Sequence, residues 1–178
     1  GQGIAANINS LCFNLPSSIG TAVTTMISIN MGLKNIKKSK KIFTYSWITS
    51  VVIAALTIIL IVPLNHNMIS LFTINREVAV IADNALNIFT YSIIGFGIFT
   101  VCQGVYVALG KNNIPLIMSI LRIWLFRYAF ILLTQKFLGL YSIFWGNLFS
   151  NTAAGILFFY LVKTLDWENV DVKKLKIK

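Results

Sequence analysis

The sequence predicts an all-α integral membrane protein with five transmembrane helices. Three observations carry this prediction: 57% of the 178 residues are hydrophobic, only 11% are charged, and the apolar residues form long continuous runs. A soluble domain carries about 25% charged residues, so these side chains cannot cover the surface of a soluble fold. The mean hydropathy of +0.78 agrees with a lipid environment.

Five apolar segments each approach the ~20 residues that a helix needs to cross a bilayer. Their continuous character favours helices over the alternating ten-residue strands of a membrane barrel. We expect one transmembrane domain over residues 1–164, followed by a basic tail over residues 165–178. The expected spans are residues 4–29, 42–62, 82–109, 114–134 and 138–162.

The positive charges predict the orientation of the spans. Alternate connections and the tail hold eleven lysines on one side, five of them in the loop MGLKNIKKSKK, against Arg76 and Lys136 on the other. Basic residues are retained in the cytoplasm, so we expect this loop and the tail to be cytoplasmic. The net charge of +10 therefore reflects membrane topology, although anionic lipid headgroups are a second interpretation of the lysine loop.

No motif for a nucleotide, a metal or a nucleophilic enzyme occurs in the chain. Cys12 and Cys102 both fall inside apolar segments, where thiols pack as small hydrophobic groups. We therefore predict no enzyme activity, no cofactor, no metal site and no nucleic-acid partner.

Polar side chains inside three segments are the first candidates for a site. Asn7 and Asn14 lie seven residues apart, so an α-helix places them on one face. The third segment contains Tyr91 and Gln103, and we expect all four residues to border a substrate cleft. The alternative is that these residues only join helices through hydrogen bonds.

Arg122 and Arg127 lie near the middle of the fourth segment, where each costs about 2.5–3.5 kcal/mol to insert. In an α-helix they point about 140° apart, so we expect them on different faces, with Arg127 reaching toward the external end. We expect Arg122 to face the bundle interior, where its partners are helix amides and carbonyls near Asn147 and Asn151 of the last segment, or an acid outside the fragment. We expect no acid inside the segments to pair with Arg122. We predict a structural or gating role for these three residues rather than direct binding of a cationic drug, because the positive charge would repel such a drug.

Four stretches in order resemble the C-terminal part of the multidrug and toxic compound extrusion (MATE) transporters. The first loop matches the family at Asn30, Gly32, Asn35 and Lys40, with Ile29 in place of the usual Gln. The other three stretches are LFTINREV at 71–78, YVALGKNNIPLIMSILR ending at Arg122, and LGLYSIFWG at 138–146, where Ser142 replaces a Gly.

The resemblance implies a twelve-helix transporter of two six-helix lobes, of which this chain is a fragment holding spans eight to twelve. It implies a multi-pass protein of the plasma membrane that exports cationic or amphipathic drug-like compounds by antiport against H⁺ or Na⁺. Its partners are then the missing N-terminal lobe and the lipid bilayer. Some members bind the coupling ion with a carboxylate in span ten, but GFGIFTVCQG has none, so we expect the ion site outside this fragment.

Two other functions stay open. A flippase of lipid-linked oligosaccharides in the same superfamily is favoured by the two arginines, because its substrates carry pyrophosphate. A non-transporting scaffold or a decayed fragment is the third possibility, and the polar helix faces argue against the scaffold.

Overall fold

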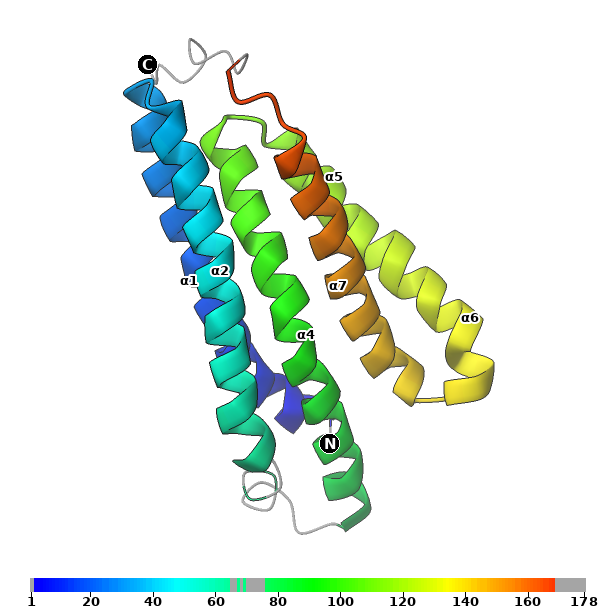
Figure 1. Ribbon diagram of the computed structural model, residues 1–178. Coiled ribbons are helices and arrows are strands. Elements are labelled where there is room, and N and C mark those ends of the chain that lie inside the picture. The colour runs from blue at the N-terminus through cyan, green and yellow to red at the C-terminus, as the bar shows by residue number, and fades with distance from the viewer. Residues whose placement is uncertain (1, 65–66, 68, 70–75, 169–178) are drawn as a thin grey trace.

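The computed structural model is a bundle of five long helical rods, as the sequence predicts (Figure 1). It describes residues 2–64, 67, 69 and 76–168, and only the backbone of residues 2–9 and 11–12. The rods are α1 (Gln2–Gly32), α2 (Ile36–Ile61), α4 (Arg76–Ala108), the continuous series α5 (Asn113–Ile120), η2 (Leu121–Tyr128) and α6 (Ala129–Leu138), and α7 (Tyr141–Lys163); a short 3-10 turn, η1 (Val62–Leu64), follows α2.

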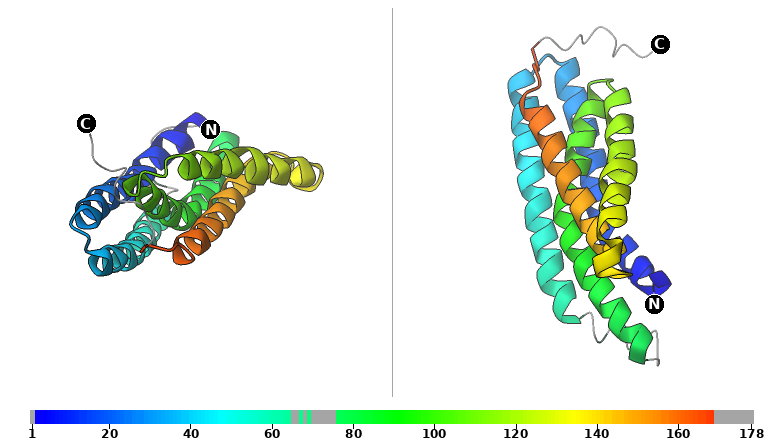
Figure 2. Two further views of the ribbon diagram at one scale, coloured as in Figure 1. Left: turned by 90° about the horizontal axis from the view of Figure 1, so that it is seen from above. Right: turned by 90° about the vertical axis from the view of Figure 1, so that its right-hand side faces the viewer.

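Helix α4 is the centre of the bundle. It packs against α1, α2 and α7, and Figure 2 shows α1 and α2 on one side of it and the α5–α6 rod and α7 on the other. Its glycines allow the backbones to approach closely. A Cβ on Gly104 would lie 2.5 Å from the carbonyl oxygen of Gly20 in α1, and a Cβ on Gly155 of α7 would lie 2.6 Å from that of Gly95.

Small residues drive this packing because lipid gives helices no hydrophobic reason to associate. Two hydroxyl groups reinforce the α1–α4 contact: Thr24 donates to the carbonyl of Gly104 at 3.2 Å, and Thr100 donates to that of Pro16 at 3.0 Å. Pro16 lies inside α1 and cannot donate a backbone hydrogen bond. The first turns of α1 turn away from the axis of the rest of the helix (Figure 2), as proline kinks do.

Within the described part of the chain, three rods have the length and hydropathy to cross a membrane: Ile36–Leu64, Arg76–Ala108 and Asn113–Leu138. Helices α1 and α7, of 31 and 23 residues, are long enough but do not reach the same mean hydropathy. The outer side of α2 exposes Val52, Leu56 and Ile59, as expected of a helix that faces lipid.

Several helix boundaries differ from the prediction. Helix α2 begins at Ile36 rather than residue 42, so most of the lysine loop is helical, and Asn35 caps this helix by accepting a hydrogen bond from the Lys38 amide at 3.1 Å. Helix α4 begins at Arg76 rather than residue 82. Asp83 lies in this helix and also within the expected span of residues 82–109, so the expectation that the spans hold no acid is wrong.

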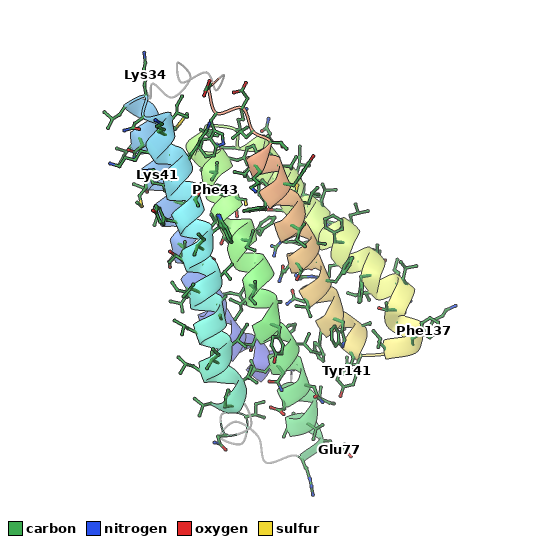
Figure 3. All side chains as sticks on the ribbon, viewed as in Figure 1. Lys34, Lys41, Phe43, Glu77, Phe137 and Tyr141 are labelled. Carbon is green, nitrogen blue, oxygen red and sulfur yellow. The ribbon has the colours of Figure 1, made fainter. Side chains whose placement is uncertain are left out.

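Successive connections lie at opposite ends of the bundle, as the sequence predicts. Lys34 and Lys41 lie at one end, while Glu77, Phe137 and Tyr141 lie at the other (Figure 3). The chain turns at the second end at Gly139, whose positive φ of 53° is readily adopted by glycine. The tail lysines beyond residue 168 lie outside the described residues.

Candidate functional site

A π-helix in the middle of a membrane span organises the candidate site. Residues Leu121–Tyr128 form η2, in which the backbone hydrogen bonds join residues five apart. A turn of this kind brings residue i+5 nearly above residue i. Arg122 and Arg127 are five apart, so they point to one side, and the expectation of different faces is wrong. The expected separation of about 140° holds only for an α-helix with 3.6 residues per turn.

Arg122 faces α7 and contacts Asn151, one of the two asparagines that the sequence suggested as partners. Its Nη1 donates to Oδ1 of Asn151 at 2.8 Å, and Asn151 is only 1% exposed. The guanidinium carbon lies 4.8 Å from the ring centre of Phe99 and 5.3 Å from that of Phe96. Such cation–π contacts partly replace the water that a buried guanidinium loses. Nε of Arg122 is buried without a hydrogen-bond partner among the described residues.

Arg127 also contacts α7 and does not reach outward as expected. Its Nη2 donates to Oδ1 of Asn147, and its Nε donates to the hydroxyl of Ser150 at 3.3 Å. The two asparagines are linked, because Nδ2 of Asn151 lies 3.4 Å from Oδ1 of Asn147. Nδ2 of Asn147 donates in turn to the hydroxyl of Ser92 on α4 at 3.4 Å. One polar network therefore connects η2, α7 and α4 inside an apolar bundle.

This network borders a cavity of about 420 Å³, which we call the arginine cavity. Aromatic rings form much of its wall and the two guanidinium groups and two amides form its polar part. The lining residues are Ser10, Phe13, Phe89, Phe96, Arg122, Arg127, Ile143, Asn147 and Asn151. No described Asp or Glu lines it, so its field is positive, and in surroundings of low dielectric that field is strong.

A second cavity of about 380 Å³ lies along the contact between α1 and α4. Most of its lining residues carry a hydroxyl or amide group, among them Ser17, Thr21, Thr25 and Gln103. We call it the hydroxyl cavity. Its polar wall can offer hydrogen bonds to an amphipathic molecule, and it carries no charged side chain among the described residues.

The structure separates the four predicted cleft residues. Gln103 lines the hydroxyl cavity, whereas Tyr91 is 48% exposed and lines neither cavity. Asn14 is exposed on α1, and the side chain of Asn7 lies outside the described residues. Their role in substrate binding stays a prediction.

Sequence reasoning missed the aromatic part of the arginine cavity. Phe89 and Phe96 of α4 both line it and lie seven residues apart, a helical spacing that could have indicated one ring-bearing face. Among the described residues there is no cluster of three His, Cys, Asp or Glu side chains that could hold a metal ion. Cys102 is fully buried and free, as expected of a thiol that packs as a small hydrophobic group.

Comparison with solved structures gives the same arrangement of helices. The eukaryotic MATE transporter AtDTX14 matches with a TM-score of 0.86 and 16% identity over 97% of this chain and 39% of its own. A MATE protein in complex with MaL6 matches with a TM-score of 0.84 and 18% identity over 98% of this chain and 38% of its own. An inward-facing multidrug resistance MATE family transporter of the MOP superfamily matches with a TM-score of 0.83 and 18% identity over 97% of this chain and 40% of its own.

The chain thus spans about two fifths of the length of these transporters, with which it shares the fold. A search of curated proteins found no match. The family model MatE matches residues 1–133, which is most of the 178-residue chain. The bundle of apolar helices and this match lead to one conclusion: the chain is a multi-pass membrane protein that belongs to the MatE family.

Proposed function

We propose that the chain forms most of one lobe of a secondary transporter that exports cationic or amphipathic compounds by alternating access. The observation that carries the proposal is the polar network of Arg122, Arg127, Asn147 and Asn151 inside a lipid-covered bundle. Polar groups at such depth are costly to insert. A scaffold that only needs to fill a membrane has no use for them.

In this proposal the hydrogen bonds of the network hold η2 and α7 together. Its hydrogen bonds run from the guanidinium groups to neutral amides, which can change partners without leaving a full ion pair broken. A transporter lobe needs such interchangeable contacts, because its helices shift between outward-open and inward-open states. The arginines serve structure or gating here, since their positive charge repels a cationic substrate.

The substrate cleft of the proposal runs along α1 and α4. The hydroxyl cavity supports this position because Gln103 and the threonines of α1 line it without charge. Asn7, Asn14 and Tyr91 are the other proposed contacts. An uncharged polar wall beside apolar helices suits molecules that are partly apolar and carry one cationic group.

The proposed transporter also requires the second lobe and a coupling ion. We place the acid that binds H⁺ or Na⁺ outside the two described cavities, because neither contains a described carboxylate. The lysine-rich end of the bundle then faces the cytoplasm with the tail, and the protein resides in the plasma membrane.

The arginine cavity favours a second candidate, the flippase of lipid-linked oligosaccharides. Two guanidinium groups at one cavity suit a pyrophosphate, which arginine binds through paired hydrogen bonds. The amides that already occupy Arg122 and Arg127 argue for the first candidate.

Transport by the full-length protein in liposomes distinguishes the two candidates. We expect a cationic dye to accumulate against its gradient when a pH or Na⁺ gradient is imposed, and accumulation to stop when an ionophore collapses that gradient. Translocation of a pyrophosphate-linked lipid without dye transport would support the flippase. If the correctly folded protein showed neither of these activities, that result would contradict a transport function.

A further inference from the structure

A third cavity lies at the lysine-rich end of the bundle, in the groove between α2 and α7. Its volume is about 430 Å³, and we call it the interfacial groove. It is lined by Lys40, Phe43, Thr44, Trp47, Phe159, Val162, Lys163, Leu165 and Trp167. The segment after α7 forms part of its wall through Leu165 and Trp167, and Trp167 is only 5% exposed.

Aromatic rings make the floor of the interfacial groove. Phe43 is 7% exposed and lies between Phe159, at 5.7 Å between ring centres, and Trp167, at 6.4 Å. Trp47 meets Phe159 edge to face at 5.4 Å, about two turns deeper along α2 than Lys40. Tryptophan gathers at the boundary between hydrocarbon and headgroups, so these rings mark the depth at which lipid headgroups begin.

Two lysines from different helices line the same groove. Lys40 comes from α2 and Lys163 from the last turn of α7, and both side chains are exposed. Nζ of Lys163 lies 5.8 Å from the ring centre of Phe159. The acids that follow, Asp166 and Glu168, are absent from the lining, and Asp166 accepts a hydrogen bond from the Glu168 amide at 3.1 Å.

We propose that the interfacial groove binds the headgroup of an anionic phospholipid. The phosphate lies between Lys40 and Lys163, and the glycerol and upper acyl chains lie over the rings of Trp47 and Phe159. Basic pockets between membrane helices on the cytoplasmic side bind such headgroups. Topology alone accounts for lysines at this end of the bundle, but it does not require two of them to line one cavity with an aromatic floor.

The bound lipid would hold the cytoplasmic ends of α2 and α7 together. The headgroup bridges two positive charges that otherwise repel each other, so occupancy stabilises the closed groove. This inference rests on the membrane fold and the groove, and it does not depend on which compound the protein transports.

Native mass spectrometry of the full-length protein in detergent tests the proposal. The measured quantity is the ratio of the dissociation constants for phosphatidylcholine and phosphatidylglycerol at the tightest site. We expect this ratio to fall by about fivefold for each lysine removed in the Lys40→Gln and Lys163→Gln variants. The Lys40→Arg/Lys163→Arg double variant should keep the preference, and its melting temperature shows whether such changes disturb the fold.

The Lys37→Gln/Lys38→Gln double variant is the control, because it loses two positive charges, one more than either single variant, from exposed positions of α2 outside the groove. We expect it to change the ratio by less than about twofold. An equal fall in this control would show a diffuse surface charge and overturn the site. Displacement of phosphatidylglycerol by millimolar inorganic phosphate would identify a site for free phosphate and overturn the lipid assignment.

Discussion

Removing the Asn151 amide should destabilise the bundle mainly through the charge that it leaves behind. In the Asn151→Ala variant, Nη1 of Arg122 loses its acceptor at 2.8 Å, beside an Nε that already has no described partner. A hydrogen bond to a charged group contributes about 1.5–3 kcal/mol, and a buried group left unpaired costs a similar amount. The rings of Phe96 and Phe99 still hold the guanidinium in place. We therefore expect a loss of about 2–4 kcal/mol in the free energy of unfolding.

The partner variant has a different balance. Arg122→Leu also breaks the bond to Asn151, but it removes a central charge whose insertion costs about 2.5–3.5 kcal/mol. We expect this variant to lose little stability. In its background, Asn151→Ala removes only a neutral amide, so its effect should fall to about 1 kcal/mol. The double-mutant cycle then gives a coupling energy of about 2 kcal/mol.

The assay is reversible unfolding of the purified protein in mixed micelles with increasing denaturing detergent. Thr152→Ala serves as the control, because this neighbouring side chain is exposed, and it should change the unfolding free energy by less than about 0.5 kcal/mol. Additive effects of Arg122→Leu and Asn151→Ala would refute the reasoning, since they would show that the two side chains do not stabilise each other.

Three further predictions concern packing, orientation and the cleft. Gly155→Ala should destabilise the protein by about 1–3 kcal/mol, because the added Cβ would lie 2.6 Å from the α4 backbone. The control Gly32→Ala should not destabilise it, because no atom lies near the added Cβ. Equal melting temperatures of these two variants would show that the α4–α7 contact relaxes freely. Cysteines introduced singly at Leu33 and Phe137, which are 73% and 87% exposed at opposite ends, should react with an impermeant thiol reagent from the cytoplasm and from outside, respectively; labelling of both from one side would contradict the topology. Gln103→Leu should change the profile of exported compounds while expression stays intact, and lost expression with an unchanged profile would identify a packing residue.

The sequence predicted the membrane fold well because hydropathy and charge act through solvent rather than through specific contacts. Long apolar runs need lipid, and lysines collect at one end, so the rods and their alternation follow without knowledge of packing. The helix ends were less predictable. The start of α2 at Ile36 depends on the cap from Asn35, which allows a run of lysines to be helical.

The site was only partly predictable from the sequence. Asn147 and Asn151 share a face at a spacing of four residues, so they were natural partners for Arg122. The π-helix was not foreseeable from periodicity, because no residue type in LRIWLFRY specifies a wider turn. It joins Arg127 to the same network and creates a cavity with two cations.

The transport rate of the Arg122→Leu variant tests the central claim most directly. The claim is that the arginine–amide network serves a transport cycle rather than the mere assembly of the bundle. The measurement is the initial rate of cationic dye transport in liposomes, with equal amounts of folded protein. We predict that Arg122→Leu inserts well and transports at a small fraction of the wild-type rate, while Arg122→Lys keeps part of it. Dye transport by Arg122→Leu at the wild-type rate would contradict the account.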